Sequence, residues 1–230
     1  MKIFSLTLCH KVFPIELREK IAFKDEDAIS FLSGLKEEHE IKNALLVSTC
    51  NRTELFIAAE NVHQGLKTLE QVLEVWERER NFKLPICPPP NIIDHYSSVE
   101  RLLRVTSGLE SQIVGESEIQ GQVRTAMDLS AEAGVNGQVI LKLWEKALRC
   151  GKRVRSETPL GDGALSVAYG ALEVARKTFG GVPTSAYLPP PPALPVSRRP
   201  CSSTLIEMFN LVKGLVSRLR SQSCRIINMF

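Results

Sequence analysis

Several patterns that would define a class of protein are missing from this 230-residue sequence. No window approaches the roughly 18 consecutive apolar residues of a membrane-spanning helix, which argues against a membrane protein. The apolar segment within residues 1–10 is too short for a signal peptide and lacks a small-residue cleavage site. The six cysteines include no CxxC pair, which argues against zinc and disulfides and favours reduced thiols. We therefore expect a cytoplasmic protein.

The sequence also lacks the glycine-rich turn GxGxxG that cradles the phosphates of a dinucleotide, so no residue is assigned to a nicotinamide cofactor. A large net charge is missing too, because the formal value is only +3. Residues 181–230 hold six Lys/Arg and one Asp/Glu, which leaves residues 1–180 with a charge of −2. Any contact of residues 1–180 with nucleic acid would therefore depend on a local basic patch.

Hydrophobic periodicity predicts strands that come first and helices that fold over them. We expect an α+β two-layer sandwich, with a ferredoxin-like antiparallel sheet followed by a helical connector. The predicted strands are residues 2–9, 43–49 and 53–59. The predicted helices are residues 14–20, 24–39, 62–79, 97–107, 118–133 and 136–156, and the proline-rich residues 85–90 are a loop.

A single cysteine, Cys50, stands where the apolar run 44–47 ends, and Arg52 follows two positions later. A thiol is nucleophilic only as the thiolate, and a nearby positive charge lowers the pKa of a cysteine. The alternative is a buried, inert cysteine at the end of a strand, which is the common state of this residue. Local chemistry alone leaves both interpretations open.

Three sequence blocks resemble glutamyl-tRNA reductase. Residues 48–55 (STCNRTEL) are similar to its nucleophile motif, residues 105–123 (VTSGLESQIVGESEIQGQV) to its second substrate-binding segment, and residues 151–158 (GKRVRSET) to the end of its catalytic region. The order and spacing match, and the resemblance covers roughly residues 1–180. It implies NADPH-dependent reduction of glutamyl-tRNA(Glu) to glutamate-1-semialdehyde. That reaction is the first step of tetrapyrrole (5-aminolevulinate, porphyrin) biosynthesis by the C5 pathway.

The resemblance gives the first block its chemistry. Cys50 would attack the ester carbonyl, release tRNA and hold the glutamyl group as a thioester, which hydride from NADPH would reduce to the aldehyde. Arg52 would clamp the side-chain carboxylate of the substrate, since a guanidinium pairs bidentately with a carboxylate. The alternative for Arg52 is a surface salt bridge to Glu54. Thr49 and Asn51 would orient the substrate by hydrogen bonds, although either is also an ordinary turn residue.

In the second block, five residues occupy positions at which the family contacts its substrate: Ser111, Glu116, Ser117, Glu118 and Gln122. Gly108 and Gly115 bracket a six-residue segment and allow unusual backbone conformations there. The paired acids Glu116 and Glu118 suggest either a metal site, an acid–base pair or capping of the following helix. We expect recognition of the substrate amino group together with capping, and no metal.

One position departs from the family. Arg101 stands where the family usually has a histidine implicated as a base or orienting group, and arginine cannot accept a proton. Three explanations remain open: the role is dispensable, His95 reaches in, or this copy is impaired. We expect His10, His39 and His63 to be surface residues.

The predicted helix 136–156 carries a basic stripe formed by Lys142, Lys146, Arg149 and Arg153, with Lys152 and Arg155 beside it. Phosphate contacts with tRNA would explain this stripe, and a solvated helix face explains it equally well. By resemblance, the partners are glutamyl-tRNA(Glu) and glutamate-1-semialdehyde aminotransferase, and the family is a homodimer. No membrane partner is expected.

The resemblance divides the chain into residues 1–156, the catalytic domain; 157–180, a helical connector; and 181–230, a tail unlike the family. In the family, a helix like the one predicted at 164–179 leads into an NADPH-binding Rossmann domain. Here seven of the 13 prolines fall between residues 183 and 200, which favours polyproline II structure. Residues 205–219 regain helical periodicity as a basic amphipathic helix, which would suit a membrane surface, a partner or the chain's own domain. We interpret the tail as a frameshift product, with altered splicing as the alternative, and expect no dimerisation helices.

The leading hypothesis is therefore a glutamyl-tRNA reductase represented by its catalytic domain. Because the NADPH-binding segment is absent, the chain is expected to form the thioester and lose it to water, as a glutamyl-tRNA esterase. A non-catalytic tRNA- or protein-binding remnant and a pseudogene product without function are the alternatives.

Overall fold

The computed structural model describes residues 1–81, 83, 91–93 and 95–161. Its centre is a four-stranded antiparallel sheet with the strand order β2-β3-β1-β4. The strands are β1 (Lys2–Cys9), β2 (Ala44–Thr49), β3 (Arg52–Ala59) and β4 (Asn91–Ile93). Helices α1 (Ile15–Ile21) and α2 (Asp25–His39) connect β1 to β2, and α3 (Val62–Glu79) follows β3. This is the strand order of a ferredoxin-like sheet.

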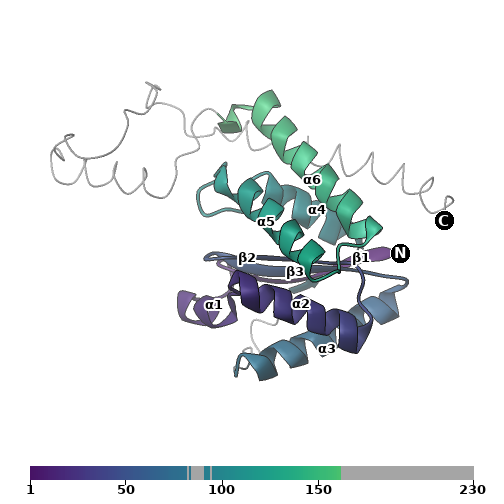
Figure 1. Ribbon diagram of the computed structural model, residues 1–230. Helices are drawn as coiled ribbons and strands as arrows, with labels where there is room; N and C mark the ends of the chain where they lie inside the picture. Colours follow the sequence, from purple (N-terminus) through teal and green to yellow (C-terminus); the bar gives the residue numbers. More distant parts are fainter. Residues whose placement is uncertain (82, 84–90, 94, 162–230) are drawn as a thin grey trace.

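Three further helices follow β4 and cover the opposite face of the sheet (Figure 1). They are α4 (His95–Thr106), α5 (Glu118–Glu132) and α6 (Gln138–Glu157), and a short 3-10 turn, Pro159–Gly161, comes after them. The sheet thus lies between α1–α3 on one side and α4–α6 on the other. Among the described residues, no helix combines the length and the apolar character needed to cross a bilayer.

Two hydrophobic cores explain why both faces of the sheet are covered. Phe4, Leu6 and Leu8 of β1 pack with α1–α3 in the first core. Ile3 of β1 packs with Val47 and with α4–α6 in the second core. Burying the apolar area on both faces stabilises this arrangement, because exposing either face would cost about 25 cal/mol per Å² of apolar surface.

The predicted α+β class and the antiparallel ferredoxin-like sheet are confirmed, and every predicted element that lies in described residues starts and ends within about three residues of the observed one. The two-layer description fits the elements through β4, and α4–α6 add a third layer. Polar Ser5 and Thr7 alternate with apolar residues along β1 and suggest a solvated face. Instead, Ser5 is fully buried and its hydroxyl hydrogen-bonds the Ser98 hydroxyl of α4 at 3.0 Å.

Strand β4 was not predicted, since it has only three residues and follows the proline-rich run. Leu160, four residues beyond the predicted domain end, is buried in the second core. The predicted loop 85–90, the helices 164–179 and 205–219, and the tail 181–230 lie outside the described residues.

Candidate functional site

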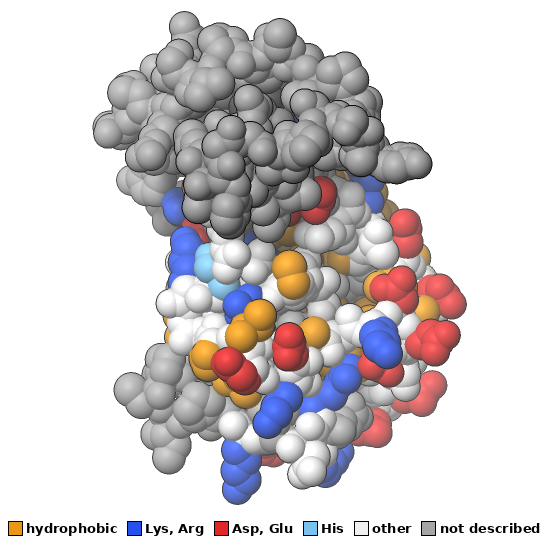
Figure 2. Space-filling model, turned by 90° about the vertical axis from the view of Figure 1, so that its left-hand side faces the viewer, with side chains coloured by type: hydrophobic (Ala, Val, Ile, Leu, Met, Phe, Trp, Pro, Cys, Tyr) orange, Lys and Arg blue, Asp and Glu red, His pale blue; other side chains and the backbone are white. Residues whose placement is uncertain are grey.

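The turn between β2 and β3 consists of Cys50 and Asn51, because Thr49 pairs directly with Arg52. The Asn51 amide donates to the Thr49 hydroxyl at 3.2 Å, which braces the turn internally. The thiol of Cys50 is exposed, whereas Cys9 and Cys150 are buried. The strands therefore present one accessible thiol, among the described cysteines, at the end of a rigid hairpin. Figure 2 views the molecule from this end, where apolar side chains lie among both basic and acidic ones.

Two segments from earlier in the chain hold the Cys50–Asn51 turn. The backbone amide of His10, just after β1, donates to the Asn51 carbonyl at 2.8 Å. Arg18 of α1 donates from Nη1 to the Cys50 carbonyl and, at 3.2 Å, to Asn51 Oδ1. Arg18 thus supplies a cation at the turn, a role that no sequence pattern predicted. Arg18 lies 32 residues away in the chain, and only the packing of α1 against the sheet end brings it there.

Arg52 points into the interior and is only 1% exposed. Its Nη1 donates to Glu54 Oε1 at 3.1 Å, and its Nη2 donates to the Glu110 carbonyl. Residues two apart in a strand share a face, which explains the pairing with Glu54. The expected alternative, a salt bridge to Glu54, therefore exists, but it is buried and not at the surface. The clamp role of Arg52 stays a prediction.

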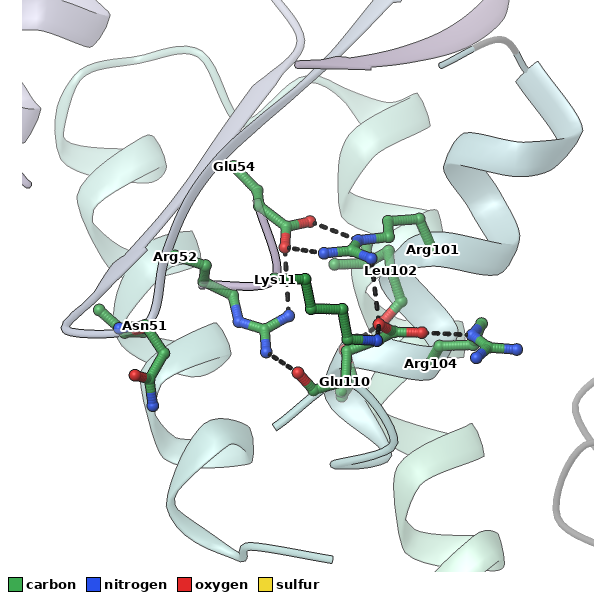
Figure 3. A network of polar contacts seen from close by, with 10 residues as sticks. Lys11, Asn51, Arg52, Glu54, Arg101, Leu102, Arg104 and Glu110 are labelled. Carbon is green, nitrogen blue, oxygen red and sulfur yellow. Dashed lines mark hydrogen bonds and ion pairs between the residues drawn. The ribbon is translucent and has the colours of Figure 1, made fainter. Parts of the chain in front are cut away.

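A network of charges surrounds Arg52 (Figure 3). Glu54 accepts two further bonds from Arg101 of α4, from Nε at 3.0 Å and from Nη2 at 2.7 Å. Glu110, after α4, accepts from Arg101 Nη1 at 3.2 Å, from Arg104 Nε at 2.6 Å and from Lys11. We call these six residues, Lys11, Arg52, Glu54, Arg101, Arg104 and Glu110, the ion network. Sequence reasoning linked only Arg52 with Glu54 and missed the rest, because the partners come from four separate segments.

The pKa shifts follow from burial and from these contacts. Burial alone would raise the pKa of Glu110, but hydrogen bonds from Lys11 and Arg104, helped by the charge of Arg101, lower it to about 2. Burial works against the charge on Arg101 as well, yet the hydrogen bond with Glu54 and the negative charges of Glu54 and Glu110 together outweigh it and raise the arginine pKa. Both groups are therefore ionised at neutral pH.

Arg101 occupies the position of the family histidine and acts here as a bridge between Glu54 and Glu110. The explanation that His95 substitutes for that histidine is wrong. His95 Nδ1 accepts from the Ile3 amide at 2.9 Å, near the start of β1. The Cys50 turn lies at the other end of this strand, about 20 Å away at roughly 3.3 Å per residue.

His10 is not the surface residue that we expected. It is half-buried, and its Nδ1 is buried without a hydrogen-bond partner among the described residues. Burial and the charge of Arg52 lower the pKa of His10, and the hydrogen bond with the Asn51 backbone opposes this only in part. His39 is half-buried as well, so only His63 matches the expectation.

The second block forms a closed loop between α4 and α5. Gly108 and Gly115 have φ angles of 79° and 91°, and the Gly115 amide donates to the Gly108 carbonyl at 3.0 Å. Positive φ favours glycine, so the prediction of unusual backbone conformations at these two positions is confirmed. Arg155 of α6 holds the loop by donating from Nη2 to the Glu116 carbonyl at 3.0 Å.

The predicted substrate residues of this block differ in how far they are exposed to solvent. Ser111 is buried, Glu116 is half-buried, and Ser117 and Glu118 are exposed. Glu118 is the first residue of α5 and lies in its first turn, as the helix-dipole argument predicts. Within the described ranges, no group of three or more His, Cys, Asp or Glu side chains is arranged to hold a metal ion.

Gln122 of α5 shares a cleft with the first block. The cleft has a volume of about 360 Å³ and runs between α2 and α5 beside the edge strand β2. Its polar lining comes from Ser48, Asp25, Gln122 and Thr125. Ser48 belongs to the first block and Gln122 to the second, so residues of both blocks line this cleft.

The described residues do not fit NADPH. A dinucleotide site needs a parallel strand, a glycine-rich turn and a helix whose N-terminus faces the pyrophosphate. The sheet here is antiparallel, and the sequence contains no GxGxxG. We derive no hydride step from this part of the chain.

Arg101→Ala should lower the free energy of unfolding by about 3 kcal/mol, because it leaves the fully buried Glu54 with one cationic partner fewer. Urea denaturation at neutral pH measures this loss. The matched control is Arg153→Ala, which breaks an exposed pair with Glu157 on α6 and should leave the free energy of unfolding nearly unchanged. Equal losses in the two variants would refute the importance of the ion network.

Stability should also fall in acid. The folded pKa of Glu110 is about 2, below its usual value of 4.5, so its stabilisation is complete above pH 4.5 and disappears toward pH 2. Urea titrations from pH 7 to pH 2 should show wild type losing up to about 3 kcal/mol relative to Glu110→Gln. Glu157→Gln, in an exposed pair, is the control. A wild-type advantage over Glu110→Gln that is unchanged across this range would contradict the assignment.

Comparisons with known proteins show the family of the chain. Residues 6–158 match the family model described as the N-terminal domain of glutamyl-tRNA(Glu) reductase. Glutamyl-tRNA reductase of Halalkalibacterium halodurans is 37% identical over 182 residues, which cover 78% of this chain and 39% of the relative. The Bacillus subtilis enzyme is 35% identical over 182 residues, covering 79% of this chain and 40% of the relative.

A solved structure of a glutamyl-tRNA reductase is similar as well. Glutamyl-tRNA reductase from Methanopyrus kandleri matches with a TM-score of 0.59 and 28% identity, over 76% of this chain and 40% of that one. The chain thus spans about 40% of the length of these relatives. Since the family model matches well over half of its residues, the chain belongs to the glutamyl-tRNA reductase N-terminal domain family.

Proposed function

We propose that this chain carries out the acylation step of a glutamyl-tRNA reductase. The Cys50 sulfur attacks the ester carbonyl that joins glutamate to the terminal ribose, a C–S bond forms, and the C–O bond to the tRNA breaks. The observation that carries this proposal is the exposed Cys50 thiol in a turn braced by His10 and Arg18. A nucleophile on a fixed hairpin is already oriented, so the reaction loses less entropy in bringing it to the ester carbonyl.

The substrate would lie between the two blocks. The cleft beside β2 supports this position, because Gln122 lines it together with Ser48. Thr49, Asn51, Ser111, Glu116, Ser117 and Glu118 complete the proposed substrate contacts. Arg52 binds the side-chain carboxylate of glutamate in this proposal. To do so, it has to share its guanidinium with Glu54 or release the Glu110 carbonyl.

The later steps are proposed for the whole enzyme. Reduction to glutamate-1-semialdehyde, the first step of tetrapyrrole biosynthesis, needs NADPH held by residues other than those described. Transfer of the aldehyde to an aminotransferase, homodimerisation and a cytoplasmic location stay predictions of the same kind. Without a hydride donor, the thioester on Cys50 has water as its only acceptor, so this chain alone would act as an esterase.

Purified chain mixed with radiolabelled glutamyl-tRNA should acquire label on Cys50, seen after acid quenching and peptide mapping. Cys50→Ser should abolish the label, because an alcohol is a much poorer nucleophile near neutral pH. Cys150→Ser is the matched control and should keep the label, since Cys150 is buried against Ser107. The label should then leave as free glutamate.

Two results would revise this proposal. Tight tRNA binding without any label on Cys50 would favour the non-catalytic tRNA-binding remnant, with the Arg101 replacement as the first suspect. NADPH-dependent aldehyde formation by the purified chain would support the acylation step and refute the proposal that the chain acts as an esterase.

The basic stripe on α6 is the proposed tRNA contact. Lys142, Lys146, Arg149 and Lys152 are exposed, and the opposite side of the helix is buried in the second core. Arg153 pairs with Glu157, and Arg155 binds the Glu116 carbonyl, so these two residues have structural partners. The exposed stripe is therefore shorter than the one expected from sequence.

The double variant Lys146→Glu/Arg149→Glu should weaken tRNA binding. A complex with fewer phosphate contacts releases fewer counterions when it forms, so less free energy is gained on binding. The slope of log K against log salt should shrink by about one per contact removed. Filter binding at several salt concentrations measures both effects. Lys67→Glu on α3, in the opposite helix layer, is the control. A double variant that binds as wild type does would exclude the stripe.

A further inference from the structure

His10 has an unusual environment for a histidine outside the motifs that carry the family resemblance. It follows the last residue of β1, and its backbone amide pairs with Asn51, the residue next to Cys50. Its Nδ1 is buried and makes no hydrogen bond of regular geometry among the described residues, although the Asn51 backbone is close enough to act on the pKa of the ring. A buried nitrogen without a partner costs free energy, on the order of 1–3 kcal/mol, which indicates that a donor reaches it in another state of the site.

Few hydrogen-bond donors of the Cys50–Asn51 turn are available to His10. The Asn51 side chain is engaged by Arg18, and the Asn51 amide is engaged by the Thr49 hydroxyl. The Cys50 thiol is exposed at the same turn and reorients by rotation about one side-chain bond. Cys50 directly precedes Asn51 in the chain, so its thiol is the S–H donor that this turn offers to the imidazole.

We propose that His10 Nδ1 accepts the proton of the Cys50 thiol, in place of the histidine that Arg101 replaces. This inference rests on the proposed function. As the C–S bond forms and the C–O bond breaks, the proton passes from sulfur to His10 and then to the departing ribose oxygen. No oxidant, reductant or further reactant is required for this step.

The charges around His10 suit both transfers. The charged groups that act on it are Arg52 of β3, Lys11 of the same loop and Arg18 of α1, and all three are cations. Burial and these cations keep the pKa of His10 below 6.5, so the imidazole is neutral and able to accept a proton at pH 7. The imidazolium that results is a stronger acid than that of an ordinary histidine, which favours passing the proton on to the leaving oxygen.

Two measurements on His10→Gln test the proposal, with His63→Asn as the control at an exposed histidine. The first is the rate of Cys50 alkylation by iodoacetamide from pH 5 to pH 9, which needs no tRNA. Wild type and the control should show a rise in rate with a midpoint below pH 6.5, and His10→Gln should lack it. The second is single-turnover acylation by glutamyl-tRNA at pH 7, which should fall roughly 100-fold in His10→Gln.

The backbone bond to Asn51 survives any side-chain change, and an unchanged urea midpoint would verify that the variant is folded. His10→Asn, with a shorter amide, repeats the test if His10→Gln is unstable. A slower acylation with an unaltered alkylation profile would mean a structural role and overturn the proposal. Normal acylation in His10→Gln would also overturn it and leave the proposed function intact. Loss of the alkylation rise, with no acylation even in wild type, would uphold the proton transfer and reject the proposed function.

Discussion

The arrangement of the site depends on two carboxylates, Glu54 and Glu110, that are removed from water and paired with arginines. A buried charge without partners is strongly destabilising, so each carboxylate must be satisfied by cations in fixed positions. Those cations come from the loop after β1, from β3 and from two turns of α4. The ion network therefore fixes the sheet end, α4 and the loop after α4 relative to one another.

This constraint has a direct consequence for the substrate-binding blocks. Arg52 belongs to the first block and binds the backbone carbonyl of Glu110 in the second, 58 residues away. The loop between Gly108 and Gly115 is held from the other side by Arg155 of α6. The two blocks that carry the family resemblance are thus joined by buried contacts, and the Cys50 turn is positioned against them.

The cations near the thiol have a different distribution from the one that sequence proximity suggests. Arg52 is two residues from Cys50, yet its side chain points into the protein because strand residues alternate between faces. Arg18 and the half-buried His10 approach the turn from α1 and from the end of β1. Arg101, at the position of the family histidine, is a structural bridge between Glu54 and Glu110 here.

Much of the fold was determined by the sequence alone. Periodicity located the strands and helices, since apolar spacing in β2, β3 and α3 is set by local geometry, and the motif around Cys50 located the turn and the family. The tertiary structure decided the rest: the third layer of helices, the short strand β4, the ion network, and the places of Arg18, His10 and His95. These features depend on contacts that include pairs of residues from 32 to 99 positions apart, and no local pattern encodes such pairs. Burial then gives each contact its energy, because the same charges would interact weakly at a solvated surface.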